Sequence, residues 1–102
     1  MVSVIIVNFK TPYLLTRCIE KIYSNSNFIT VECIIIDNAS NDNSELITKE
    51  KFPDVIWINN PSNEGFGRAN NIGALSASGE YILFLNSDRK STRLNSSHGI
   101  IS

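Results

Sequence analysis

Residues 81–88 read Tyr-Ile-Leu-Phe-Leu-Asn-Ser-Asp, an apolar run that ends in three polar residues. A short apolar run of this kind is typical of a strand buried in a sheet. In an open α/β sheet, ligands bind in the crevice outside the carboxyl ends of the strands. Asp88 would lie in such a crevice, where a divalent metal would offset its repulsion of a nucleotide diphosphate. The stretch therefore predicts a metal ligand at Asp88.

Three other apolar segments, residues 2–7, 31–36 and 55–58, are also predicted to be buried strands. Segments with helical signals separate them, so the predicted order is βαβαβαβ. Right-handed crossovers then give an α/β fold with a Rossmann-like, doubly wound parallel sheet. A chain of 102 residues is short for such a domain, so we expect a sheet truncated after its fourth strand.

The three helices are predicted from their boundary signals. Thr11 and Pro12 would be the N-cap and first residue of a helix in which apolar residues recur at fourfold spacing. Asp42, with Glu45 three residues later, resembles a capping box that opens the second helix. The third helix carries small residues that suit a close approach to the sheet, and Gly79 would end it.

Charge and cysteine content exclude several classes of protein. The formal net charge is −1, which gives no sign of nucleic-acid binding. Cys18 and Cys33 match no metal or redox spacing and lie in apolar runs, so both are predicted to be buried free thiols. No apolar run approaches the ~18–20 residues of a membrane span, and no signal peptide is recognisable. We therefore expect a cytoplasmic domain without a transmembrane segment.

The character of the chain changes at Arg89. Residues 89–102 hold three basic residues and no acidic one, and their apolar residues show no period. This composition predicts a disordered tail. The tail also resembles the translation of sequencing-adapter read-through, so we expect it to be non-native, with the native sequence cut at Asp88. His98 lies in this tail and is not expected to be catalytic, because a base needs a rigid support.

Polar residues follow the other predicted strands. Asp37 ends the second strand beside Asn8 at the end of the first, so both should line one crevice. The Asp37 carboxylate would accept a hydrogen bond from a base or ribose, or else cap its own turn. Asp42 is better explained as a helix cap. The segment 63–73 combines a glycine turn with a helix start, which suits an anionic ligand or, equally, simple packing.

Two other classes of protein remain alternatives. Gly65-Phe66-Gly67 begins like a dinucleotide fingerprint, but Asn70 occupies the third glycine slot and the first βα turn lacks glycine. This disfavours a dinucleotide-dependent oxidoreductase half-domain. In a non-catalytic α/β regulatory or interaction domain, the polar strand ends would be solvated turns. Binding of pyrimidine diphosphates with metal, of NAD, or of neither would separate the three classes.

Four ordered motifs resemble the donor-binding half of a family 2 glycosyltransferase, which has the GT-A fold. They are VSVIIVNF at residues 2–9, IIIDNASND at 34–42, NEGFGRANNIG at 63–73 and LFLNSD at 83–88. The resemblance implies that residues 1–88 are a partial nucleotide-sugar-binding domain of an inverting enzyme. It also implies that the acceptor site and the catalytic aspartate base belong to a missing second half. We therefore expect no catalytic residue in this chain and no turnover by the chain alone.

The resemblance also assigns the binding residues of the donor site. Asp37 would bond to a pyrimidine base, and Asp88 would bind Mg²⁺ or Mn²⁺ as the last residue of the DxD motif. The other positions would contact the nucleotide-sugar, from the base to the diphosphate: Val7, Asn8, Phe9, Asn63, Gly65, Phe66, Asn70 and Asn86.

Two residues depart from the usual family pattern. Asn86 replaces the first aspartate of DxD, so the site would carry one less negative charge and hold its cation more weakly. Asn70 stands where many members have an arginine. Both changes recur in the branch that resembles bacterial rhamnosyl- and galactofuranosyltransferases. This branch implies a UDP- or dTDP-sugar donor, a saccharide or lipid-linked acceptor, and cell-surface polysaccharide synthesis in the cytoplasm or at the inner face of the membrane.

Overall fold

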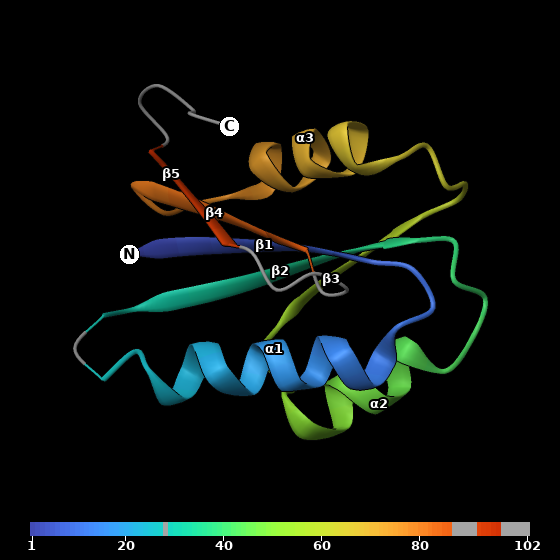
Figure 1. Cartoon of the computed structure of the whole chain (residues 1–102), viewed down its shortest axis with the longest axis horizontal. Helices are drawn as coiled ribbons and strands as arrows, with labels where there is room; N and C mark the ends of the chain where they lie inside the picture. The colour runs from blue at the N-terminus through green and yellow to red at the C-terminus, as the bar shows by residue number, and fades with distance from the viewer. Residues whose placement is uncertain (28, 87–91, 97–102) are drawn as a thin grey trace.

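The structure of the chain, a computed structural model, describes residues 1–27, 29–86 and 92–96 (Figure 1). One sheet has the strand order β3-β2-β1-β4-β5. The first four strands are parallel, and β5 runs antiparallel to β4. The predicted α/β class and doubly wound parallel order are confirmed. The strands are β1 (Val2–Asn8), β2 (Val31–Asn38), β3 (Ile56–Asn60), β4 (Tyr81–Asn86) and β5 (Thr92–Ser96).

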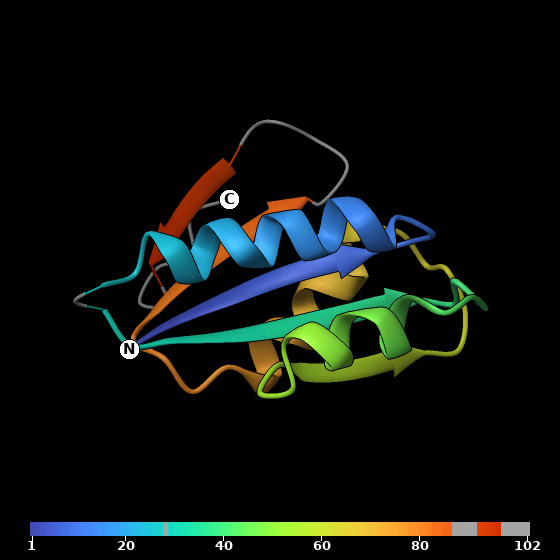
Figure 2. The ribbon, with the colours of Figure 1, turned by 90° about the horizontal axis from the view of Figure 1, so that it is seen from below.

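Helices cover both faces of the sheet. Figure 2 shows α1 (Pro12–Ser24) and α2 (Ser44–Lys51) in front of the strands, with α3 (Phe66–Ser76) behind them. The chain moves outward from β1 to β3 with both connecting helices on one face. It then returns across the other face, through α3, to place β4 on the free side of β1. The strand order therefore reverses between β1 and β4, which is the switch point of a doubly wound sheet.

Each face of the sheet has its own apolar core, because successive side chains of a strand point to opposite faces. Burying one such aliphatic side chain contributes about 1.5–3 kcal/mol relative to leaving it exposed. The core toward α1 and α2 contains Val4, Ile6, Leu15, Ile19, Cys33, Ile35, Val55 and Leu85. The core toward α3 contains Ile5, Val7, Ile34, Ile36, Ala69 and Ile82.

The fifth strand corrects one expectation. The prediction of a disordered tail from Arg89 onward is wrong for Thr92–Ser96, which pairs along β4 with Leu94 opposite Leu83. Without this partner, β4 would be a sheet edge with unpaired backbone groups, and pairing satisfies those groups. The described sheet therefore has an antiparallel fifth strand beside the four predicted parallel ones. The other residues of the predicted tail, and Asp88, lie outside the described residues.

The predicted capping box of α2 is also wrong. The N-cap is Asn43, and Asp42 instead accepts a hydrogen bond from the Ser44 backbone N–H at 2.9 Å. Glu45 turns away from the helix start, where it accepts a hydrogen bond from Asn59 and pairs with Lys49. The hydrogen bond from Asn59 and, to a smaller extent, that from Lys49 hold the pKa of Glu45 below its usual value. Asp42 still satisfies one backbone donor of the first turn, as a capping residue does.

The end of α3 lies earlier than predicted. The helix stops at Ser76 with Ala77 as its C-cap, so Gly79 does not end it. Gly79 instead donates its N–H to the Ser3 hydroxyl at 2.8 Å. A Cβ at Gly79 would lie 2.7 Å from the Met1 carbonyl oxygen, so only glycine allows this approach of the α3–β4 turn to β1.

The prediction that both cysteines are buried free thiols holds in full only for Cys33. Both thiols are free, with Cys33 buried and Cys18 half-buried. Burial raises the pKa of both thiols, that of Cys33 to about 11. Within the described residues, every helix is too short or too polar to span a bilayer.

A substitution at Gly73 tests the close packing of α3 on β1. A Cβ there would lie 2.5 Å from Cγ2 of the fully buried Ile5. We expect Gly73→Ala to lower the free energy of unfolding by about 1–3 kcal/mol, the range for overpacked cores. Gly67 in the same helix has nothing within 4 Å of its Cβ position, so Gly67→Ala is the control and should gain up to ~1 kcal/mol from helix propensity. Urea unfolding followed by circular dichroism measures both, and equal effects would contradict the packing.

Candidate functional site

Polar side chains gather at the carboxyl ends of the parallel strands. The register places Asn8 of β1 opposite Asp37 of β2, and Asp37 opposite Asn59 of β3. One position further along, Asn38 faces Asn60. Because this edge includes the switch point between β1 and β4, it is where an open α/β sheet binds its ligands. The sequence prediction that Asp37 lies beside Asn8 is confirmed.

Asp37 is buried, with 6% of its surface exposed, and both carboxylate oxygens accept hydrogen bonds. Its Oδ1 accepts from the Asn8 side-chain amide at 2.7 Å and from the Ser40 hydroxyl at 2.6 Å. Its Oδ2 accepts from the Ser40 backbone N–H at 3.1 Å. The Ser40 hydroxyl in turn accepts from the Lys10 backbone N–H, and the Thr11 hydroxyl donates to Asn8 Oδ1. The loops after β1 and β2 are thereby held together.

The Asp37 carboxylate therefore caps its own turn and also fastens the neighbouring strand. Three of its roughly four acceptor positions are occupied, which leaves room for one further donor at Oδ2. The two loops that it joins contain left-handed residues, with φ of 58° at Lys10 and Ala39 and 53° at Asn41. Such a backbone costs about 1–2 kcal/mol for a residue with a side chain. The hydrogen bonds of Asp37 help to offset this cost.

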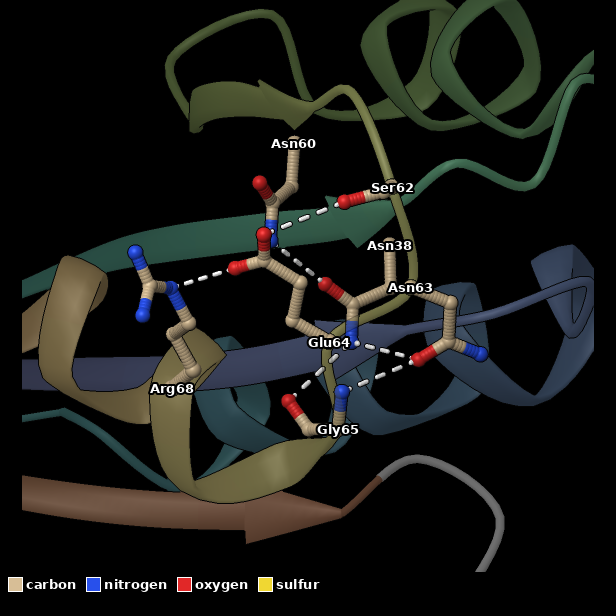
Figure 3. Close-up of polar contacts among 7 residues, drawn as sticks. All are labelled: Asn38, Asn60, Ser62, Asn63, Glu64, Gly65 and Arg68. Atoms are coloured by element: carbon tan, nitrogen blue, oxygen red, sulfur yellow. Dashed lines mark hydrogen bonds and ion pairs between the residues drawn. The ribbon is translucent and has the colours of Figure 1, made fainter.

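Asn38 builds a second polar network on the opposite face, toward α3 (Figure 3). Its side-chain NH₂ donates to Asn63 Oδ1 and to the Gly65 carbonyl, each at 3.3 Å. Its Oδ1 accepts from the Asn60 side-chain amide at 2.9 Å. Asn63 Oδ1 also accepts the Gly65 backbone N–H at 3.1 Å. The loop between β3 and α3 is therefore attached to the end of β2.

The amino end of α3 follows this loop directly. Gly65 has a φ of 89°, a conformation that glycine adopts without strain. Its N-cap residue is Gly65, so no N-cap side chain bonds to the first turn, and that turn holds no acidic residue. Glu64, just before the helix, is paired with Arg68 (Figure 3). The uncapped backbone N–H groups and the positive end of the helix dipole suit an anionic group.

The remaining predicted site residues differ in how far they are exposed at the edge of the sheet. Phe9 and Phe66 are each 42% exposed beside the strand ends, whereas Val7 is 2% exposed and packs in the core beneath α3. The Val7 side chain therefore does not line the edge, so the predicted contact of Val7 with a base would involve its backbone. Asn70 has a buried Oδ1 without a hydrogen-bond partner among the described residues. Asn86 ends β4 opposite Val7.

A metal site cannot be built from the described residues alone. Across residues 1–27, 29–86 and 92–96, no cluster of three or more His, Cys, Asp or Glu residues could hold an ion. The carboxylate at the edge, Asp37, is already engaged by Asn8 and Ser40. Asp88, the predicted metal ligand, follows Asn86 by two positions and lies outside the described part of the chain.

Sequence analysis did not single out Asn38 or Ser40 as part of the site. A signal existed for Asn38, since it ends an apolar strand and neighbouring parallel strands end at one edge. Its hydrogen-bond partners could not be read from the pattern, because these depend on the path of the β3–α3 loop.

The chain also has an apolar groove of about 410 Å³. It lies between α1 and the sheet, away from the polar strand ends. Its lining is mostly aliphatic and includes Val2, Val4, Ile22, Ile29, Val31 and Leu83. This groove offers few polar groups and does not belong to the candidate site.

A doubly wound sheet with polar residues at its switch point is the architecture of nucleotide-binding α/β domains. The sequence model of Glycosyl transferase family 2 matches residues 3–92, and the chain belongs to that family. The resemblance drawn from the four motifs is therefore confirmed, and the oxidoreductase alternative is not supported.

Two curated relatives have similar sequences. An uncharacterized glycosyltransferase of Nostoc sp. is 37% identical over 90 residues, which make up 85% of this chain and 28% of that protein. The minor teichoic acid biosynthesis protein GgaB of Bacillus subtilis is 36% identical over 90 residues, covering 84% of this chain and 10% of that protein. The chain thus spans only a minor part of each relative.

Two solved structures share the fold. The 1–349 segment of TarS from S. aureus aligns with a TM-score of 0.75 at 25% identity, over 85% of this chain and 26% of that one. A mannosyltransferase from Pyrobaculum calidifontis gives a TM-score of 0.75 at 22% identity, over 85% of this chain and 27% of that one. The four parallel strands and three helices therefore form the Rossmann-like part of a GT-A fold.

Asp37 and Asp42 offer a matched test of the hydrogen bonds at the edge. We expect Asp37→Ala to lower the free energy of unfolding by about 2–4 kcal/mol, since three donors lose a buried charged acceptor. Asp42 is exposed and accepts a hydrogen bond from the Ser44 backbone N–H at the start of α2, so Asp42→Ala should cost about 1 kcal/mol. Guanidinium denaturation measures both losses. A smaller loss for Asp37→Ala than for Asp42→Ala would contradict the role of the buried carboxylate.

Proposed function

We propose that the chain is the nucleotide-sugar-binding part of an inverting glycosyltransferase that uses a UDP- or dTDP-sugar and a divalent cation. The observation that carries this proposal is the meeting of the Asp37–Asn8 pair, the Asn63–Gly65 loop and the uncapped start of α3 at one sheet edge. The two structural neighbours described above lend support, since their complexes contain UDP-GlcNAc and, in the mannosyltransferase, GDP-Man with Mn²⁺.

The base would bind above the ends of β1 and β2. The remaining acceptor position of Asp37 suits a ring N–H of a pyrimidine. Asn8 orients that carboxylate through its 2.7 Å hydrogen bond. The half-exposed ring of Phe9 gives the base an apolar surface. A UDP- or dTDP-sugar fits this arrangement because uracil and thymine each carry a ring N–H that can donate a hydrogen bond to Asp37.

The diphosphate would lie toward the β3–α3 loop. There the amino end of α3 directs backbone N–H groups outward with no acidic residue in its first turn. Asn63 and Gly65 shape the loop, and Phe66 begins the helix. Asn70 is one turn further along α3. Its buried Oδ1 has no hydrogen-bond partner among the described residues and would accept a hydrogen bond from a donor group of the ligand.

A cation at this site would be Mg²⁺ or Mn²⁺, held by Asp88 with Asn86 as a neutral oxygen neighbour. When bound, the cation supplies charge stabilisation for the departing nucleotide. The chain's own residues would position the base and the diphosphate relative to this cation. Replacement of the first DxD aspartate by Asn86 leaves a site with less negative charge.

The reaction itself would need residues outside this chain. A carboxylate of the longer protein would take the proton of an acceptor hydroxyl, whose oxygen then forms a bond to the anomeric carbon. The bond from that carbon to the diphosphate breaks, and attack from the opposite face inverts the configuration. The acceptor would be a saccharide or lipid-linked saccharide, as the teichoic acid relative suggests. We place this activity in the cytoplasm or at the inner face of the membrane.

The assignment of Asp88 is tested by the metal dependence of nucleotide binding. In the unaltered chain, we expect Mn²⁺ to tighten UDP binding by about tenfold or more, equivalent to at least ~1.4 kcal/mol. In Asp88→Asn this response should vanish, while metal-free binding stays equal or improves because a repulsive charge is gone. Asn86→Asp should strengthen the metal response by the same reasoning. Isothermal titration with Mn²⁺ and with EDTA gives all of these values.

A matched control removes a carboxylate elsewhere. Asp54 lies in the turn before β3, at the opposite end of that strand, so Asp54→Asn should keep the full metal response. If Asp88→Asn also keeps it, Asp88 is an ordinary turn residue. Binding of NAD in place of UDP or dTDP would support a dinucleotide-binding domain. Binding of none of these nucleotides would support a non-catalytic domain.

A further inference from the structure

Asn38 is buried at the last position of β2, with 2% of its surface exposed. A buried side-chain amide is costly unless its donors and acceptor are satisfied. Each end of this amide is satisfied by a different neighbour. The oxygen accepts from Asn60 on β3, and the NH₂ group donates to Asn63 and Gly65 in the loop that leads into α3.

These bonds act on a loop that has little else to hold it. All five residues of the loop, 61–65, are exposed, so burial of apolar surface contributes little to their placement. The Asn38 amide gives the loop two direct connections to the sheet (Figure 3). Removing them leaves the loop without this attachment to β2. It also removes one of the two groups that hold Asn63 Oδ1 in place, the other being the Gly65 N–H itself.

The Gly65 carbonyl links the loop to the helix. It accepts from Asn38 and also from the Ala69 backbone N–H at 3.3 Å, which is an early hydrogen bond of α3. The body of α3 is anchored separately, because Ala69 is fully buried and Gly73 packs against Ile5. Loss of the Asn38 amide should therefore loosen the loop and the first turn while the rest of the helix stays packed.

We infer that Asn38 is a positioning residue of the donor site, which holds the 61–65 loop and the amino end of α3 against β2 for the diphosphate of the nucleotide. Its neighbour Asp37 holds the base side from the opposite face of the same strand end. Two consecutive residues thus place the base-binding and diphosphate-binding sides relative to each other. This inference rests on the proposed function for its ligand, but the positioning of the loop can be measured without any ligand.

The first measurement is hydrogen exchange of the backbone amide of Gly65 in the unaltered chain and in Asn38→Ala. The expected result is at least tenfold faster exchange at Gly65 in the variant, with exchange in β1 unchanged. Asn60→Ala is the matched control, since it removes a hydrogen bond to the same amide but leaves both loop bonds in place. Equal exchange at Gly65 in the unaltered chain and Asn38→Ala would overturn the inference.

The second measurement is UDP affinity in the presence of Mn²⁺, at a temperature where thermal melts show every variant to be folded. Asn38→Ala should weaken UDP binding about five- to tenfold, as expected when one or two modest hydrogen bonds that organise a site are lost. Asn60→Ala should stay within about twofold of the unaltered chain. Asn63→Ala should weaken binding like Asn38→Ala, and the double variant should add little, because the two side chains share one interaction.

The outcomes separate this inference from the proposed function. If the unaltered chain binds UDP, dTDP and GDP with no measurable affinity, the donor site itself is refuted, whatever the exchange data show. If UDP binds and Asn38→Ala weakens it no more than Asn60→Ala does, the donor site stands and the positioning role is refuted. Faster Gly65 exchange together with weaker UDP binding in Asn38→Ala supports both.

Discussion

Burial of β1 on both faces is the constraint from which the rest of the fold follows. Ile5 and Val7 face α3, while Val4 and Ile6 face α1, and all four are nearly inaccessible to solvent. A strand that is apolar on both sides needs helices on both sides, and parallel neighbours need crossover connections that supply them. The chain therefore runs outward on one side of β1 and returns on the other. The switch point at the carboxyl end of β1 is a direct consequence.

The amino end of the sheet sets the register that brings the site together. The buried Ser3 hydroxyl donates to the Glu32 carboxylate and accepts from Gly79, while the Ser78 N–H donates to the same carboxylate at 2.7 Å. This network joins the start of β4 to β1 and β2. Because strands are regular, fixing their first residues also fixes which residues meet at the far end, where Asn86 lies opposite Val7.

At the carboxyl end of β2, the consecutive side chains of Asp37 and Asn38 point to opposite faces of the sheet and form separate hydrogen-bond networks. Asp37 serves the loops after β1 and β2, while Asn38 serves β3 and the entry to α3. Both residues are buried, so each must satisfy its polar atoms within the protein. Their hydrogen bonds order exposed loops that contain left-handed residues and little apolar surface. Loops ordered in this way by a rigid sheet are typical positions for binding residues.

The sequence by itself determined the four parallel strands, their order and the meeting of Asn8 with Asp37, because apolar β-branched runs, crossover handedness and parallel pairing are all local or general rules. It also carried the family motifs. Only the tertiary structure decided that Val7 packs in the core, that Asp42 and Glu45 form no capping box, that β5 pairs with β4, and that Asn38 fastens the β3–α3 loop. A hydrophobic pattern specifies which faces of a strand or helix are buried. The hydrogen-bond partner of each polar atom depends instead on strand register and on the path of the loops, and both are set by contacts between segments that are far apart in the sequence.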